Sequence, residues 1–259
     1  MFVELFGPPG VGKTTVARAL AVRLRERGQR VKLVLSFRSP KERVPRHDDR
    51  APPPHLPALL HRLGRPMVET VAAFAGPADP CGASMITELM RLLPPEGVVR
   101  SLRLRQYLVR LIRNRGRAAA VAGDVVLFDQ GFVQAVYSLA TLGKTADRES
   151  IGRALDAVPR VELVVRLDAP AECLRARLAE RRLRQGKIER LLDSWSAFGS
   201  SGTFNQLDEL LQIRGQTIAR VDTGDRRSLN AGLDKVEAII REIQGATAIV
   251  SATHRLGLE

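Results

Sequence analysis

The feature that most constrains this chain is a glycine-rich loop near its N-terminus. Residues 7–14 read GPPGVGKT, which matches the pattern G-x-x-x-x-G-K-[ST]. A short apolar segment, residues 2–6, precedes the loop, and residues 13–27 follow it with apolar side chains at helical spacing. The pattern requires this order of strand, loop and helix, so a chance glycine-rich turn explains it poorly. We predict a phosphate-binding loop.

The residue types in this loop indicate how it would bind a nucleotide. Gly10 and Gly12 allow backbone conformations in which successive N–H groups point inward at an anion. The helix that begins at Lys13 adds the positive end of its dipole. Lys13 can reach the β- and γ-phosphates, and the Thr14 hydroxyl can bind Mg²⁺. We therefore expect ATP and Mg²⁺ as cofactors, held by Gly7, Pro8, Pro9, Gly10, Val11, Gly12, Lys13, Thr14 and Thr15.

The rest of the chain alternates strand and helix patterns. Apolar strands are predicted at 2–6, 31–36, 125–129, 161–168 and 218–222. Helical patterns are predicted at 13–27, 56–62, 67–75, 83–93, 97–116, 131–141, 170–184 and 228–243, with weaker ones at 188–197 and 205–216. This alternation predicts an α/β P-loop NTPase fold with a parallel five-stranded sheet flanked by helices.

The domain organisation follows from shifts in composition. We predict one domain over residues 1–245 and a tail without a pattern over 246–259. Prolines crowd residues 38–66 and disfavour regular structure there, and a long loop inside a compact domain is commonly functional. We interpret residues 38–95 as an inserted helical and loop region that binds the acceptor substrate.

Charge and cysteine content limit the class of protein. The chain has 41 Lys and Arg against 28 Asp and Glu, a formal net charge of +13 that suggests anionic ligands. Its two cysteines, Cys81 and Cys173, are too few for a disulfide framework, which favours a reducing cytoplasm. No apolar run approaches the roughly 20 residues of a membrane span, and the N-terminus does not resemble a signal peptide.

Other segments separate the classes of P-loop protein. GTPases need a base-reading N-K-x-D segment, which is absent from this sequence. AAA+ ATPases share the GPPGxGKT loop but usually carry a strand ending in Asp-Glu, whose Glu polarises water. Here the corresponding strand ends in Asp129-Gln130-Gly131, and Gln cannot act as a base toward water.

Residues 161–190 read VELVVRLDAPAECLRARLAERRLRQGKIER, an apolar strand followed by an Arg-rich helix. Arg177, Arg181 and Arg184 share one face of the predicted helix. The segment resembles the Arg-rich lid of nucleoside-monophosphate kinases, especially the thymidylate-kinase-like group. Residues 219–225, ARVDTGD, resemble that group's last strand, whose following loop passes the adenine. The resemblance covers residues 2–36 and 124–243.

This resemblance implies roles for particular residues. A lid over 175–190 would bring Arg177 and Arg181 onto the triphosphate as catalytic residues, and Asp225 would lie beside the nucleotide. An Arg after the second strand, here Arg38, often contacts the acceptor, and Arg100 and Arg103 would border its pocket. A bland alternative is that these arginines are solvated surface charges. Kinases of this group are often dimers, so a homodimer is one expectation.

The acceptor side departs from the thymidylate-kinase pattern. Asp129 ends the central strand, where it can orient Mg²⁺ and take the proton of an acceptor hydroxyl, although such residues also commonly cap helices. The family's Arg after this Asp is missing, as is the acidic residue that usually stands where Pro9 does. A carboxylate without its Arg suits a hydroxyl acceptor (a nucleoside, sugar or other metabolite) slightly better than a nucleoside monophosphate.

The sequence therefore predicts an ATP-dependent kinase of small molecules, with Lys13, Asp129, Arg177 and Arg181 as catalytic residues and Thr14 and Asp129 at the metal. Two other functions stay open. The basic helix at 97–117 is consistent with a polynucleotide kinase or a nucleic-acid-stimulated ATPase, although aromatic residues make up only 4% of the chain. A nucleotide-binding regulator without transfer activity is the other. Glu4, in the first strand, either pairs with an Arg or lies near Mg²⁺.

Overall fold

Five parallel strands form the centre of the molecule. The structure is a computed structural model, and it describes residues 1–36, 80–120, 123–143, 146–184 and 201–256. The strands β1 (Phe2–Phe6), β2 (Val31–Val34), β3 (Val125–Phe128), β4 (Leu163–Asp168) and β5 (Ile218–Asp222) lie in the order β2-β3-β1-β4-β5. Each neighbouring pair is parallel, as the alternating pattern predicts. All five carboxyl ends therefore meet at one edge of the sheet.

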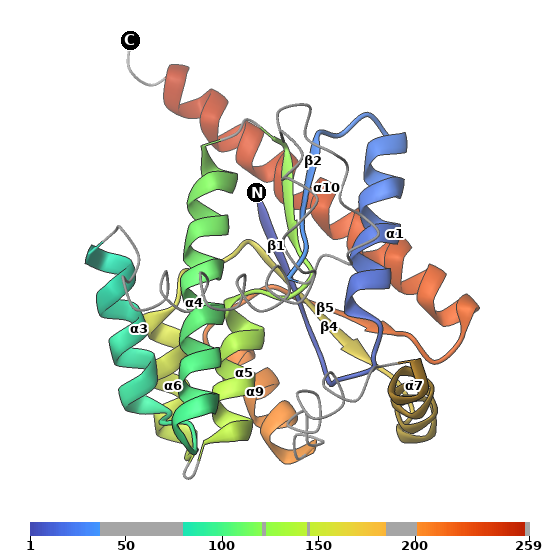
Figure 1. The fold of residues 1–259 in the computed structure, drawn as a ribbon. Helices are drawn as coiled ribbons and strands as arrows, with labels where there is room; N and C mark the ends of the chain where they lie inside the picture. Colours follow the sequence, from blue (N-terminus) through green and yellow to red (C-terminus); the bar gives the residue numbers. More distant parts are fainter. Residues whose placement is uncertain (37–79, 121–122, 144–145, 185–200, 257–259) are drawn as a thin grey trace, which may run out of the picture.

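Helices cover both faces of this sheet (Figure 1). On one face lie α1 (Lys13–Glu26) and α10 (Arg226–Leu256). The other face carries α3 (Pro80–Leu92), α4 (Val98–Ala119), α5 (Phe132–Leu142), α6 (Arg148–Ala157) and α9 (Ser201–Ile213). The remaining helix of the described residues, α7 (Ala171–Arg184), follows β4 and lies beside the carboxyl edge.

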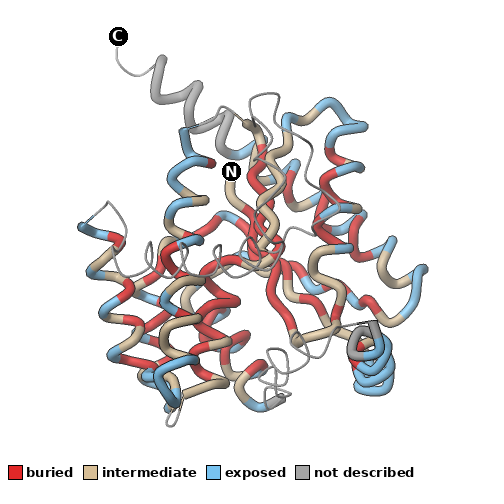
Figure 2. The backbone as a smooth tube through the Cα atoms, in the orientation of Figure 1, coloured by how far each residue is buried: buried red, intermediate tan, exposed pale blue. Residues whose placement is uncertain are grey.

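The alternation of side chains along each strand separates two hydrophobic cores. In β1, Val3 and Leu5 face α1 and α10, whereas Phe6 faces the layer of α4, α5 and α9. In β3, Leu127 and Phe128 divide in the same way. Figure 2 shows the buried residues concentrated in the strands and on the helix faces that turn toward them. The strand ends are thereby held in register at the carboxyl edge.

Some boundaries differ from the sequence prediction. The sequence analysis expected no regular structure after residue 245. The structure instead continues the helix α10 to Leu256. The helix α6 was not predicted, because it has only 10 residues and follows a segment with few apolar positions. Its start is fixed by Asp147, whose side chain accepts a hydrogen bond from the Ser150 backbone N–H at 2.7 Å.

The expected insertion at 38–95 is described only in its last part. Residues 37–79 lie outside the described residues, as do the short helices predicted at 56–62 and 67–75. Leu89 in α3 is fully buried, and so is Leu93, the first residue after this helix. Both belong to the core between the helices and the sheet, so this part of the segment is a structural layer of the domain.

Candidate active site at the carboxyl edge of the sheet

The glycine-rich loop adopts the geometry that its residue types predict. Gly10 and Gly12 have φ angles of +82° and +94°, a region that side-chain-bearing residues rarely occupy. The Lys13 ammonium donates hydrogen bonds to the backbone oxygens of Gly7 at 2.6 Å and Pro8 at 3.1 Å. The side chain of Lys13 therefore folds back over the first residues of the glycine-rich loop. No side chain caps the start of α1, so its first N–H groups can bind an anion.

The Asp129 carboxylate joins three segments of the chain at this edge. Asp129 is fully buried and directly follows β3. One of its oxygens accepts a hydrogen bond from the Thr14 hydroxyl at 2.8 Å. The other accepts from the Ser36 backbone N–H at 2.7 Å and from the Ser36 hydroxyl at 2.8 Å. The structure therefore brings the predicted metal residues Thr14 and Asp129 together, and it adds Ser36, which the sequence analysis missed.

The donor atoms in this cluster fit Mg²⁺. The Thr14 hydroxyl and the Asp129 carboxylate are oxygen ligands, which hard divalent cations prefer. Within the described residues, no group of three or more His, Cys, Asp and Glu side chains could hold a metal ion. A cation between Thr14 and Asp129 would take its other ligands from phosphate oxygens and water, as Mg²⁺ commonly does. The site therefore suits a cation that arrives with a nucleotide.

A second carboxyl group, that of Glu4, lies buried beside the turn after Asp129. Glu4 is 1% exposed and accepts a hydrogen bond from the Val133 N–H at 3.1 Å, at the start of α5. Burial raises the pKa of Glu4, and the N–H groups of Val133 and Phe132 oppose this shift. A Cβ atom at Gly131 would overlap the Glu4 carboxyl group. Glu4 therefore stands in for the helix cap that Gly131 lacks, and its main contacts are neither an Arg nor the metal residues.

Tyr107 of α4 closes the other side of this turn. Its hydroxyl donates to the Gly131 carbonyl at 3.3 Å. Burial, and then the nearby carboxylates of Glu4 and Asp129, raise the pKa of the Tyr107 hydroxyl, so it stays protonated. Arg103 and Arg100 lie one and two turns before Tyr107 on the same helix. The side of α4 that carries Tyr107 therefore lies at the Asp129 turn, and the acceptor role of Arg100 and Arg103 stays a prediction.

The other residues that the sequence analysis predicted for the acceptor and the nucleotide make no contact with the Asp129 cluster that the described hydrogen bonds show. Arg38 lies outside the described residues. Arg100 forms an ion pair at 3.4 Å with Glu96, which lies just before the start of α4. Thr15, in the first turn of α1, is exposed. These contacts leave the acceptor role of Arg38, Arg100 and Arg103 a prediction.

The predicted lid begins as a helix fixed against the phosphate loop. Arg177 of α7 donates to the Thr223 carbonyl at 2.6 Å and to the Thr223 hydroxyl at 3.3 Å, just after β5. Arg181 follows one turn later on α7, but its side chain lies outside the described part of the molecule, as do residues 185–190 of the lid segment. The catalytic role of both arginines therefore remains a prediction.

Asp225 caps the helix that follows the last strand. Its carboxylate accepts hydrogen bonds from the Ser228 N–H at 2.9 Å and the Ser228 hydroxyl at 2.7 Å, at the start of α10. These bonds lower the pKa of Asp225. The loop that contains Asp225 starts at Thr223, which itself touches the phosphate loop, so the predicted nucleotide-binding segment does lie at the correct edge.

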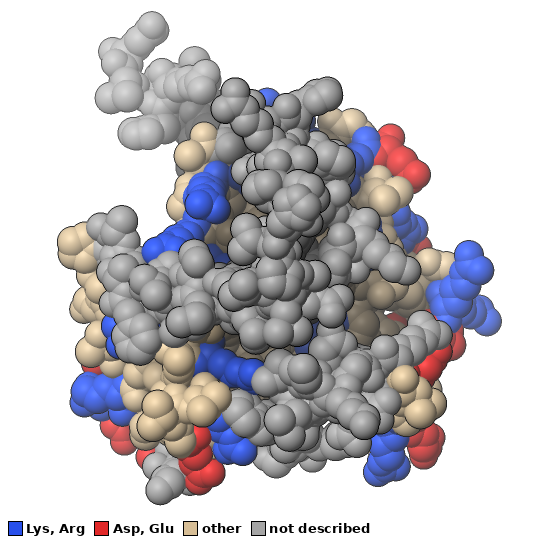
Figure 3. Space-filling model, viewed as in Figure 1, with Lys and Arg blue, Asp and Glu red and all other residues tan. Residues whose placement is uncertain are grey.

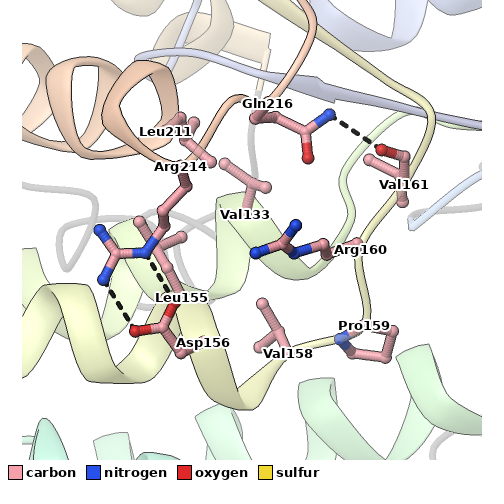
Figure 4. Close-up of a pocket in the computed structure, with 10 residues that line it drawn as sticks. All are labelled: Val133, Leu155, Asp156, Val158, Pro159, Arg160, Val161, Leu211, Arg214 and Gln216. Atoms are coloured by element: carbon pink, nitrogen blue, oxygen red, sulfur yellow. Dashed lines mark hydrogen bonds and ion pairs between the residues drawn. The ribbon is translucent and has the colours of Figure 1, made fainter.

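A small cavity lies elsewhere, between the ends of α6 and α9 and the start of β4 (Figure 4). Arg214 and Asp156 pair across its rim at 2.7 and 2.8 Å, and Gln216 donates to the Val161 carbonyl at 2.8 Å. Its volume of about 30 Å³ has room for water rather than for a nucleotide. We therefore assign no substrate to it.

Basic side chains are distributed over the described surface, and several arginines pair with buried carboxylates. Figure 3 shows Lys and Arg side chains over α4 and at several other places on this face, with Asp and Glu beside some of them. Several arginines pair internally: Arg166 and Arg220 with the buried Asp208, and Arg23 and Arg27 with the buried Glu237.

None of the described helices has the length and apolarity that crossing a membrane requires.

Comparison with known proteins finds a family model that matches part of the chain and solved structures that are similar to it. The model of the ATPase family associated with various cellular activities (AAA) matches residues 3–41, which contain the phosphate loop. No curated protein matches the chain. A solved structure of deoxyadenosine kinase from M. mycoides, with the products dCMP and a flexible dCDP bound, shares 12% sequence identity at a TM-score of 0.45. That alignment covers 94% of this chain and 100% of the other. Because loop, sheet and family match agree, the chain has the P-loop NTPase fold that its sequence predicts.

Proposed function

We propose that this protein is an ATP-dependent phosphotransferase that moves the γ-phosphate of Mg·ATP to a small acceptor. The observation that carries the proposal is the hydrogen bond of 2.8 Å between the Thr14 hydroxyl and the Asp129 carboxylate. It unites the start of α1, where the phosphates would lie, with the strand end at which ligands gather in open α/β sheets. This contact supports a phosphoryl-transfer site at this edge of the sheet.

Each residue of the cluster has a distinct role in this proposal. Lys13 exchanges the carbonyls of Gly7 and Pro8 for β- and γ-phosphate oxygens. Thr14 and Asp129 hold the cation, which neutralises charge on the phosphates when it is bound. Ser36 fixes the Asp129 carboxylate through two hydrogen bonds. Arg181, one turn beyond the anchored Arg177, supplies positive charge to the transferred group.

The surroundings of Asp129 favour a hydroxyl acceptor. An acceptor phosphate would need cationic partners, and the position after Asp129 is Gln130. Gly131 cannot carry a side chain there, because Glu4 occupies the space. A neutral hydroxyl, in contrast, gains from a carboxylate that takes its proton, an effect of roughly 10²–10⁴ in rate. A nucleoside, a sugar or another small alcohol is therefore preferred to a nucleoside monophosphate.

A panel of acceptors tests this function. Purified protein is incubated with Mg·[γ-³²P]ATP and separate pools of nucleosides, nucleoside monophosphates, sugars and aminoglycoside-like compounds, and labelled product is separated from free phosphate. We expect label in a hydroxyl acceptor, and its loss in Lys13→Ala. The control is Lys32→Ala, whose ammonium bonds the Arg117 carbonyl at the other edge of the sheet, and which should stay active. Release of free phosphate with every pool, and no labelled acceptor, would overturn the proposal.

An ATPase is the second candidate, favoured by the family match over residues 3–41. That match covers the phosphate loop, which AAA+ ATPases and kinases share. The residue after the strand-end Asp is Gln130, which lacks the carboxylate needed to polarise water. Acceptor-independent hydrolysis that disappears in Lys13→Ala would favour this function over the kinase.

A further inference from the structure

A buried threonine, Thr223, connects the phosphate loop to two other strand ends. It follows β5 directly and is 5% exposed. Its hydroxyl donates to the Val11 carbonyl at 2.8 Å and lies 3.1 Å from the Asp168 carbonyl at the end of β4. Its backbone N–H donates to the same Asp168 carbonyl at 2.8 Å. One hydroxyl group therefore links the loop after β1 with the ends of β4 and β5.

Helix α7 is attached to the same point. Arg177 donates to the Thr223 carbonyl and hydroxyl, and its side chain is held between the helix and the β5 loop. Two turns of α7 also pack on the loop backbone, because a Cβ atom at Gly10 would lie 3.0 Å from the Leu178 side chain and 3.4 Å from the Leu174 carbonyl. The loop is thus braced from outside by α7 and by Thr223.

The bond to Val11 has a direct consequence for an N–H group of the loop. Val11 C=O and Gly12 N–H belong to one trans peptide unit, so they point in opposite directions. Because the Val11 carbonyl points toward Thr223, the Gly12 N–H points away from Thr223. In a phosphate loop, such N–H groups are the ligands of the anion, and their directions decide how well it is bound.

We propose that Thr223 is a positioning residue for nucleotide binding: its hydroxyl orients the Val11–Gly12 peptide toward the triphosphate and fixes Arg177 of α7 against the loop. This inference rests on the proposed function, since it requires that the loop binds Mg·ATP. It assigns to Thr223 a role in nucleotide affinity and none in contact with the acceptor.

Calorimetric titration with Mg·ATP tests the role without requiring a known acceptor. Thr223→Val keeps the shape of the side chain and removes the hydroxyl, whereas Thr223→Ser keeps the hydroxyl. We expect Thr223→Val to weaken nucleotide binding about 10-fold, which corresponds to one lost hydrogen bond. Thr223→Ser should stay within about threefold of the wild type. Thr217→Val, at an exposed position just before β5, is the matched control and should bind normally.

The outcomes separate this inference from the proposed function. A wild-type protein that does not bind Mg·ATP overturns the proposed function, and with it the basis of the inference. Normal binding by Thr223→Val overturns the inference alone, as does a Thr223→Ser variant as weak as Thr223→Val. Once an acceptor is known, its KM should be unchanged in Thr223→Val while the KM for ATP rises. A rise in the acceptor KM instead would contradict the assigned role.

Discussion

Single residues at the carboxyl edge decide what this fold can do. Asp129 was predicted from its place at a strand end, and Thr14 from the loop motif, because parallel strands bring such ends to one edge. Ser36 and Thr223 were missed, since a hydroxyl in a loop gives no sequence signal for its partner. Their contacts depend on the register of β2 against β3 and of β4 against β5, which only the folded sheet fixes.

The first prediction concerns the chemistry of the Asp129 carboxylate. Asp129→Asn keeps the shape that Ser36 and Thr14 contact but removes the charge and the proton-accepting oxygen. We expect kcat to fall about 10²–10⁴-fold with little change in the melting temperature. Steady-state kinetics on the acceptor found in the panel will measure it. Asp168→Asn, at the end of β4 and bonded to Arg166 by its side chain, should keep near wild-type turnover.

The second prediction concerns the close packing of Gly131 on Glu4. Gly131→Ala forces a Cβ atom into the Glu4 carboxyl group and should destabilise the fold by about 1–3 kcal/mol. Denaturant unfolding measures this, and the loss should shrink in a Glu4→Ala background, where the obstruction is gone. Gly116→Ala, in α4 with open space around its Cβ position, should be neutral or stabilising. Equal effects at the two glycines would contradict the packing.

At the scale of helices and strands, the sequence patterns predicted the five strands and most of the helices, including α9 from the weaker pattern at 205–216. The five strands and the helices around them follow from alternating apolar segments. The last turns of α10 were missed because residues after 246 have no regular apolar spacing, and α6 because it is short. The lid helix was predicted from its arginines, but its packing against Gly10 depends on tertiary contact and could not be seen in the sequence.

The link between α6 and α9 leads to a prediction on pH. Arg214, just after α9, hydrogen-bonds Asp156 of α6 at 2.7 and 2.8 Å and lowers the pKa of that carboxyl. A lowered pKa contributes stability above the unfolded-state pKa of about 3.9, and this contribution is lost as the pH falls through the folded-state value. The melting temperature of Asp156→Asn should therefore lie below that of the wild type near pH 7, with a difference that narrows toward pH 2–3. A difference independent of pH would contradict the pair.

For the molecule as a whole, the net charge of +13 suggests anionic ligands, among which nucleic acid is one candidate. The structure shows part of that charge engaged in the ion pairs of Asp208 and Glu237, and it places Arg177 at the nucleotide end of the sheet. On α4, Arg100 and Arg103 are half-buried, and the exposed basic residues are Arg105, Arg110, Arg113 and Arg117. We propose that a small anionic cofactor, rather than a polymeric substrate, is the anion that this charge serves.

This account predicts weak, salt-sensitive binding of oligonucleotides. Fluorescence anisotropy with a single-stranded oligonucleotide at physiological salt should give a Kd of about 10⁻⁴–10⁻⁶ M, the range of non-specific binding. ATP turnover should not change when the oligonucleotide is added. Tight binding together with label transfer to its 5′ end would instead identify a polynucleotide kinase.

The central claim is that Thr14 and Asp129 together hold the cation of a nucleotide on the glycine-rich loop. The most direct measurement is a crystal structure with Mn²⁺ and a non-hydrolysable ATP analogue, in which anomalous scattering locates the metal. We expect the metal at a coordination distance of about 2.1 Å from the Thr14 hydroxyl, with the Asp129 carboxylate bound to it directly or through water and the triphosphate against the Gly12 N–H. A metal or triphosphate bound away from Thr14 and Asp129 would contradict the claim.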